Sequence, residues 1–136
     1  MKKILGFFIN FVAFILFVSM LALTIFINLD TKSVMEKQAL KYTEYIRDGK
    51  FKKAYNMLGD NDKQKYGDFA DAAMFIQAEL EGVDSDDIII VGSPQIVSDD
   101  LKSVYIKIID KNGNVNYSKD VMFFNKNGKW KIQGDN

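Results

Sequence analysis

The sequence contains no cysteine and no histidine, and it has one proline and one tryptophan among its 136 residues. Without cysteine there is no disulfide framework, no thiol nucleophile and no site for a lipid anchor. Without histidine, the commonest general base near neutral pH is missing, together with a frequent metal ligand. These absences argue against an enzyme, and we expect neither a cofactor nor a bound metal.

Charge is absent from residues 4–29, which are apolar apart from a few amides and hydroxyls. As a helix this run would be about 39 Å long, enough to cross a hydrocarbon core of roughly 30 Å with some tilt. The apolar core of a cleaved signal peptide is shorter, about 7–15 residues. We therefore expect residues 4–29 to be an uncleaved signal-anchor helix in the lipid bilayer.

Flanking charge predicts the orientation. Lys2 and Lys3 lie in the tail of residues 1–3, whereas acidic and basic residues balance just after the apolar run. The positive-inside rule then places the tail in the cytoplasm and residues 30–136 outside the cell membrane. Residues 30–136 hold 18 acidic and 16 basic side chains, a net charge of about −2, which argues against a footprint for nucleic acid or anionic lipid. The richness in Lys, Asn and Ile is typical of an AT-rich bacterial genome.

Helical periodicity comes first in the outer part of the chain. Apolar residues recur at i, i+4, i+7 and i+11 through residues 35–46, with capping side chains in residues 30–33 and Gly49 as a stop. Shorter stripes of the same kind follow in residues 51–58 and 69–80. We expect a helix in each of these segments.

Strand patterns then take over for the rest of the chain. They cover residues 88–91, 95–97, 102–109, 115–124 and 129–133. The break at residues 92–94 holds the proline, which a central strand would not accommodate. Asn-Gly pairs at residues 112–113 and 127–128 are strong hairpin signals. The order of elements predicts an α+β domain with an antiparallel meander.

The hydrophobic pattern tests the register of both hairpins. A two-residue loop at residues 112–113 sets Val104 opposite Val121, whereas a three-residue loop with a bulge sets Val104 opposite Asp120 and scatters the apolar side chains. We expect the two-residue loop. By the same rule, a two-residue loop at residues 127–128 sets Phe123 opposite Ile132, whereas a bulged second turn would pair Trp130 with Phe124. The last strand then carries Trp130 on the same apolar face, where Trp130 would fill the gap between the curved sheet and the preceding helices.

Two stretches resemble the nuclear-transport-factor-like superfamily, which has a cone-shaped, cystatin-like fold. Residues 39–60, ALKYTEYIRDGKFKKAYNMLGD, are similar to its opening helix pair, and residues 123–132, FFNKNGKWKI, to its final hairpin. The likeness spans roughly residues 33–133 and is strongest for small membrane-anchored extracytoplasmic bacterial members. It implies about three helices packed on a curved antiparallel sheet of about four strands.

The resemblance does not carry an activity to this chain. Enzymes of the superfamily, such as ketosteroid isomerases and scytalone dehydratase, work inside the cone with Asp, His and Tyr. Here histidine is absent, and among the acids only Asp120 approaches an inward strand position. A carboxylate of Asp71, Glu79 or Asp120 buried beside a tyrosine in an open cavity would contradict a non-enzymatic role.

Two groups of residues are candidates for binding. The first is aromatic and either lines a ligand pocket or packs the core: Tyr42, Tyr45, Phe51, Tyr55, Phe123 and Trp130. Tyrosines at an apolar wall suit recognition of a small apolar ligand or a peptide. The second is acidic, Asp84, Asp86 and Asp87, which either hold a cation or belong to a solvated loop before the first strand; we favour the loop.

We therefore expect a non-enzymatic, membrane-tethered binding or scaffold module with an unknown protein or peptide partner, and dimers through the sheet are compatible with it. An alternative is a structural subunit of a secretion or conjugation machine, similar to the inner-membrane assembly factor of type IV secretion. A third is a pilin-like protein, processed after Gly6, with one long helix reaching Asp48. Against the third, Phe11 stands where pilins usually carry glutamate.

Overall fold

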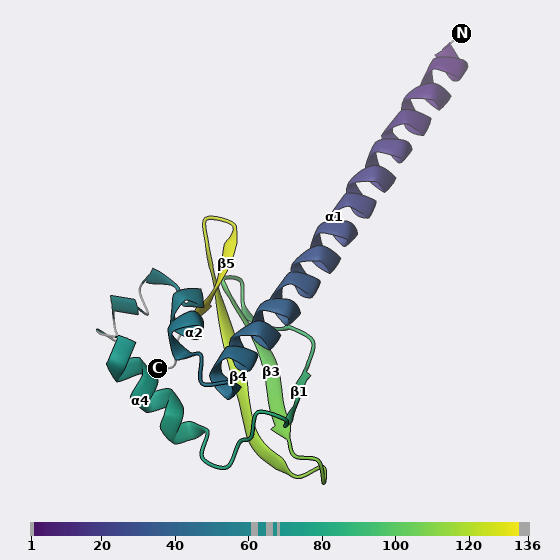
Figure 1. The fold of residues 1–136 in the computed structure, drawn as a ribbon. Coiled ribbons are helices and arrows are strands. Elements are labelled where there is room, and N and C mark those ends of the chain that lie inside the picture. The colour runs from purple at the N-terminus through teal and green to yellow at the C-terminus, as the bar shows by residue number, and fades with distance from the viewer. Residues whose placement is uncertain (1, 61–62, 65–66, 68, 134–136) are drawn as a thin grey trace. The chain divides into compact units, whose positions relative to one another are not determined.

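The computed structural model describes residues 2–60, 63–64, 67 and 69–133. In this part of the chain the helices α1 (Lys2–Arg47), α2 (Phe51–Met57) and α4 (Phe69–Glu79) precede all strands. The strands are β1 (Ile88–Val91), β2 (Gln95–Ser98), β3 (Leu101–Ile109), β4 (Val115–Lys126) and β5 (Lys129–Gln133) (Figure 1). The chain divides into two compact units, Met1–Ser33 and Val34–Asn136. The expected α+β fold with a long apolar N-terminal helix is confirmed.

Helix α1 differs from the expectation because it is not interrupted near residues 30–33. Thr31, expected as a possible N-cap, instead donates its hydroxyl to the carbonyl of Ile27 at 2.9 Å. A hydroxyl bonded to the preceding turn is compatible with a helix interior, so a residue able to cap a helix need not begin one. The helix ends as expected: Gly49 has φ +68°, and the Lys50 N–H bonds to the Tyr45 carbonyl at 2.7 Å.

In the second unit, the last turns of α1 lie against the inner face of a curled antiparallel sheet (Figure 1). The core cluster combines one face of the helix, the end of α2 and the inward positions of three strands. Its members are Met35, Ala39, Leu58, Val104, Ile106, Val121, Phe123 and Ile132. The helical period of 3.6 and the strand period of 2 thus bring their apolar residues together.

The sheet has the order β1-β3-β4-β5, and β2 also pairs with β3. Strands β1 and β2 are separate because the chain breaks between them around Pro94, as expected. At the other edge, Leu58 forms a parallel bridge with Ile132, and the Gly59 N–H bonds to the Ile132 carbonyl at 3.0 Å. The segment after α2 therefore covers part of the free edge of β5.

The first hairpin has the expected register. Val104 lies opposite Val121, Ile108 opposite Tyr117, and Ile106 opposite Lys119. Val104, Ile106 and Val121 are buried. The pairing that gathers apolar side chains on one face is therefore the one that forms.

The turn of this hairpin was wrongly predicted. The Asp110 N–H bonds to the Asn114 carbonyl at 2.9 Å, so the loop has three residues, 111–113. An Asp110 carboxylate oxygen accepts the N–H groups of Asn112 and Asn114, each at 2.8 Å, which favours this wider turn. Ile109 then lies opposite Val115, and Asn116 is an extra residue that restores the register. Burial of the apolar side chains therefore sets the register, and the bulge at Asn116 compensates for the extra residue of the loop.

The second hairpin has the expected two-residue turn. Asn127 and Gly128 have φ of 56° and 77°, as a type I′ turn requires, and Phe123 lies opposite Ile132. Phe123 is fully buried. Trp130 packs against the core but stays half-buried, with the Lys102 ammonium 4.8 Å from its ring centre. Trp130 therefore fills the gap only in part.

Three aromatic residues of this hairpin form a graded series for a stability test. Phe123→Ala should lower the free energy of unfolding by about 3–5 kcal/mol, the range for a fully buried ring. Trp130→Ala should cost about half as much, because Trp130 is half-buried. Phe124→Ala should cost about 1 kcal/mol or less, because Phe124 is exposed. Urea unfolding of the full chain in detergent, followed by circular dichroism, would measure the order, and a larger loss at Phe124 than at Phe123 would contradict the register.

Candidate functional site

A groove of about 390 Å³ lies beside the β4–β5 hairpin. Its apolar part is formed by Phe124 and Ile132, and the segment after α2 contributes Gly59 and Asp60. The remaining lining residues are Lys126, Asn127, Lys129, Lys131 and Gln133. A groove of this size that combines an aromatic floor with several charged groups has the general form of a binding site.

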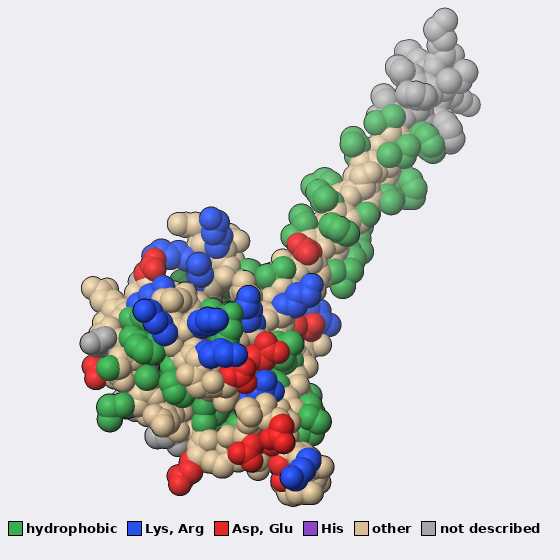
Figure 2. Space-filling view, viewed as in Figure 1, with side chains coloured by type: hydrophobic (Ala, Val, Ile, Leu, Met, Phe, Trp, Pro, Cys, Tyr) green, Lys and Arg blue, Asp and Glu red, His purple; other side chains and the backbone are tan. Residues whose placement is uncertain are grey.

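The lysines of the groove are brought together by strand pairing. Lys126 lies directly opposite Lys129, and Phe124 lies opposite Lys131. Like charges at directly opposite positions destabilise a sheet. Nothing in the packing of the hairpin requires them, since all three lysines are exposed. We call Lys126, Lys129 and Lys131 the lysine cluster. Figure 2 shows basic side chains at this end of the second unit, with an acidic side chain among them.

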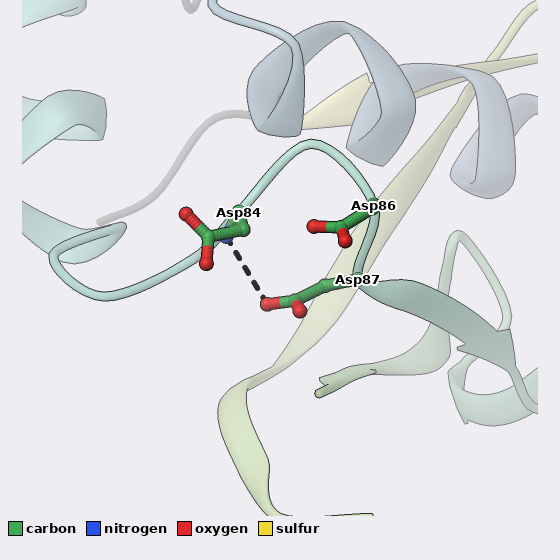
Figure 3. A group of neighbouring side chains, drawn as sticks. All are labelled: Asp84, Asp86 and Asp87. Carbon is green, nitrogen blue, oxygen red and sulfur yellow. Dashed lines mark hydrogen bonds between the residues drawn. The ribbon is translucent and has the colours of Figure 1, made fainter. Parts of the chain in front are cut away.

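The three aspartates before β1 form a compact loop (Figure 3). Carboxylate oxygens of Asp84, Asp86 and Asp87 lie within 4.8 Å of one another. Asp87 is buried, and its Oδ2 accepts hydrogen bonds from the Asp84 N–H and the Asn116 side chain, both at 3.1 Å. The Asp87 carbonyl accepts a further bond from Arg47 at 2.9 Å. Asp87 thus connects the loop to the end of α1 and to β4, which gives Asp87 a structural role.

A polar group lies where α4 faces β4. Lys119 and Glu79 form a salt bridge of 3.1 Å, and both line a small cavity of about 20 Å³ with Tyr42 and Tyr117. Burial, followed by the negative charge of Glu79, raises the pKa of Tyr117 above its ordinary value. Tyr117 is therefore a neutral phenol at physiological pH. The Glu79 side chain is 44% exposed, so this carboxylate is not enclosed beside the tyrosine.

The six aromatic candidates lie in different surroundings. Phe123 is at the centre of the core, and Tyr42 lines the small cavity. Tyr45 is half-buried between the ammonium groups of Lys41 and Lys53, at 5.8 and 5.6 Å from its ring centre.

Among the other aromatic candidates, Phe51 is half-buried at the start of α2. The Tyr55 hydroxyl donates to the Lys63 carbonyl at 3.1 Å, and its ring meets Phe69 edge to face. Trp130 lies beneath Lys102. The residues that line the 390 Å³ groove are therefore not the aromatic set chosen from the sequence.

Sequence reasoning missed the lysine cluster and the ion pair of Lys119 with Glu79. The cluster had a visible signal, because lysines flank the Asn127-Gly128 turn and alternate along the last strand. The cluster was overlooked because the net charge of residues 30–136 is negative. For the ion pair, the hairpin register placed Lys119 opposite Ile106. No sequence pattern indicated its partner, because Glu79 is 40 residues away in the sequence.

No model of a known protein family and no curated protein sequence matches this chain.

The aspartate loop gives a test with a matched control. Asp87→Ala should lower the free energy of unfolding by about 2–3 kcal/mol, because it removes the acceptor of the Asp84 N–H and one of the two acceptors of the Asn116 amide. Asp86→Ala, one residue earlier and exposed, should change it by about 0.5 kcal/mol or less. Urea unfolding with and without calcium would measure both. A loss at Asp86 that is seen only with calcium would show a cation site, and equal losses without calcium would contradict the structural role of Asp87.

Proposed function

We propose that this protein is a single-pass membrane protein that displays a non-enzymatic binding or scaffold domain outside the cytoplasm. The observation that carries the proposal is the apolar surface of α1. Apolar side chains of residues 11–29 are about half exposed or more, as in Phe14 at 65%, Met20 at 72% and Phe26 at 72%. Figure 2 shows hydrophobic side chains along this helix. An apolar surface of this extent needs lipid or a partner to cover it.

Polar groups in the same helix support a lipid environment. Ser19 donates its hydroxyl to the Ile15 carbonyl at 2.8 Å, and Thr24 donates to the Met20 carbonyl at 2.9 Å. In hydrocarbon, polar groups must be satisfied within the helix itself. The charges of Lys2 and Lys3 support an amino terminus in the cytoplasm.

The proposed domain is the second unit, and we assign it to the cystatin-like class. The helix-then-meander order and the curl of the sheet around α1 support this assignment. A non-enzymatic role is supported by the exposure of Asp71 and Asp120 and by the pairing of Glu79 with Lys119. The groove beside the β4–β5 hairpin is the proposed binding surface.

Cysteine labelling in intact cells tests the topology, since the natural chain has no cysteine. Ser85→Cys, in the exposed loop before β1, should react with a membrane-impermeant thiol reagent on intact cells. Ile4→Cys, at the cytoplasmic end of the span, should react only after lysis. The reverse pattern would contradict the orientation. Recovery of the protein in the supernatant after the membranes have been sedimented, with both positions labelled, would contradict the anchor.

A second candidate is favoured by one observation. Helix α1 is unbroken over 46 residues, as the pilin-like alternative requires. The two candidates differ at the amino terminus, because a pilin-like precursor would lose residues 1–6 by cleavage after Gly6.

The intact mass of the protein extracted from membranes separates the two candidates. We expect residues 1–6 to be present, because Phe11 stands where pilins usually carry glutamate. A mass lacking these residues, restored by Gly6→Leu, would support the pilin-like protein and contradict the signal-anchor.

A further inference from the structure

We infer that the lysine cluster binds the phosphate groups of anionic lipids in the membrane that holds the chain. The inference rests on the proposed function, because it takes residues 4–29 as the membrane anchor. It names the ligand of the groove and gives the domain a defined face toward the bilayer.

The chemistry of the groove fits such a surface. Lys126 and Lys129 lie opposite each other, and Lys131 is two residues along β5 from Lys129. Together they place three positive charges around the exposed ring of Phe124. Basic side chains next to an aromatic ring suit the bilayer interface, since the ammonium groups reach phosphates while the ring enters the boundary of the acyl chains. A phosphate between Lys126 and Lys129 would also relieve their mutual repulsion.

The position of the hairpin in the second unit fits as well. Arg47, at the end of α1, bonds to Asp87, and the adjoining Ile88 pairs with Ile109 next to the first turn. The end of α1 therefore lies at the first-turn end of the sheet. Helix α1 enters the unit at Val34, which lies about 20 Å before Arg47 along the helix axis. It enters at the end that carries the β4–β5 turn, as Figure 1 shows for this unit.

The tether between anchor and domain is short. Residues 30–33 separate the expected end of the span from Val34, and even a fully extended chain of this length reaches only about 14 Å. The covalent link alone therefore keeps Val34, where the second unit begins, within this distance of the expected end of the span. A short tether gives the cluster an effective concentration in the millimolar range, so a weak affinity for lipid is enough.

The net charge of about −2 over residues 30–136 does not oppose this arrangement. Screening limits electrostatic contact to about 8 Å at physiological salt, so only the nearest charges act on the bilayer. The aspartates before β1 lie at the other end of the sheet, because the adjoining β1 begins opposite Ile109. Acidic residues also lie at the hairpin end, since Asp60 lines the groove and the Asp100 carbonyl accepts the Asn125 N–H at 2.8 Å. The inference therefore concerns the lysine cluster and not the net charge of that end.

The single tryptophan lies within the hairpin and reports on docking. The full chain would be placed in nanodiscs of phosphatidylcholine alone or with phosphatidylglycerol, with or without a lipid that carries a nitroxide on its head group. Quenching of Trp130 by the nitroxide should be stronger in the anionic discs than in the neutral ones. It should fall at high salt, which shortens the screening length to about 3 Å at 1 M.

A charge variant and a matched control make the test specific. Each lysine near an anionic surface raises the ratio of docked to undocked protein about fivefold. The double variant Lys126→Gln and Lys129→Gln should therefore lower this ratio by about 25-fold. It should fold at least as stably as the natural chain, since it removes opposed like charges. Lys52→Gln with Lys111→Gln, two exposed lysines elsewhere, should leave the quenching unchanged.

Each other outcome has a definite meaning. Equal quenching in neutral and anionic discs, or quenching that the double variant leaves intact, overturns the inference. A lysine-dependent change of Trp130 emission on adding soluble polyphosphate to neutral discs, with no effect of anionic lipid, assigns the cluster to a soluble polyanion and also overturns it. A chain that fails to enter nanodiscs contradicts the anchor instead, so failure of the proposed function is distinguishable.

Discussion

The fold depends on burying one face of the last turns of α1. Met35 and Ala39 are almost completely buried, and they meet Phe123 and Ile132 from the sheet. A side chain as small as Ala39 allows the sheet to approach the helix closely. With no disulfide available, this contact is the main constraint that orders the second unit. The same helix includes the proposed anchor, so one continuous helix contains both the apolar N-terminal segment and part of the core of the second unit.

Burial against this helix explains how local irregularities are resolved. In the first hairpin, the Asp110 carboxylate favours a three-residue turn, which by itself would move Val104 opposite Asp120. The observed pairing is Val104 with Val121, because the extra residue Asn116 shifts the register back. Losing the apolar face of a strand costs more than forming one bulge. Asn116 then takes a second role, since its amide bonds to Asp87 in the aspartate loop.

Much of this fold could be predicted from the sequence, and the failures have physical reasons. Strand and helix segments followed from periodicity, and the register of both hairpins followed from burial. The wider first turn was missed because a side-chain hydrogen bond selected it. The continuity of α1 was missed because capping residues permit a helix start without requiring one. The groove could not be predicted, because one of its walls comes from Gly59 and Asp60, whose position depends on tertiary pairing.

The groove and the protected sheet edge have a common origin. The bridge of Leu58 to Ile132 covers part of the edge of β5, and the residue after it, Gly59, bonds to the Ile132 carbonyl. That same contact brings Gly59 and Asp60 beside the hairpin, where they form the wall of the groove. The alternation of β5 then leaves only one face for Lys129 and Lys131, because the opposite face holds Ile132 in the core. The requirement to bury Ile132 therefore orders the groove and also directs the positive charges outward.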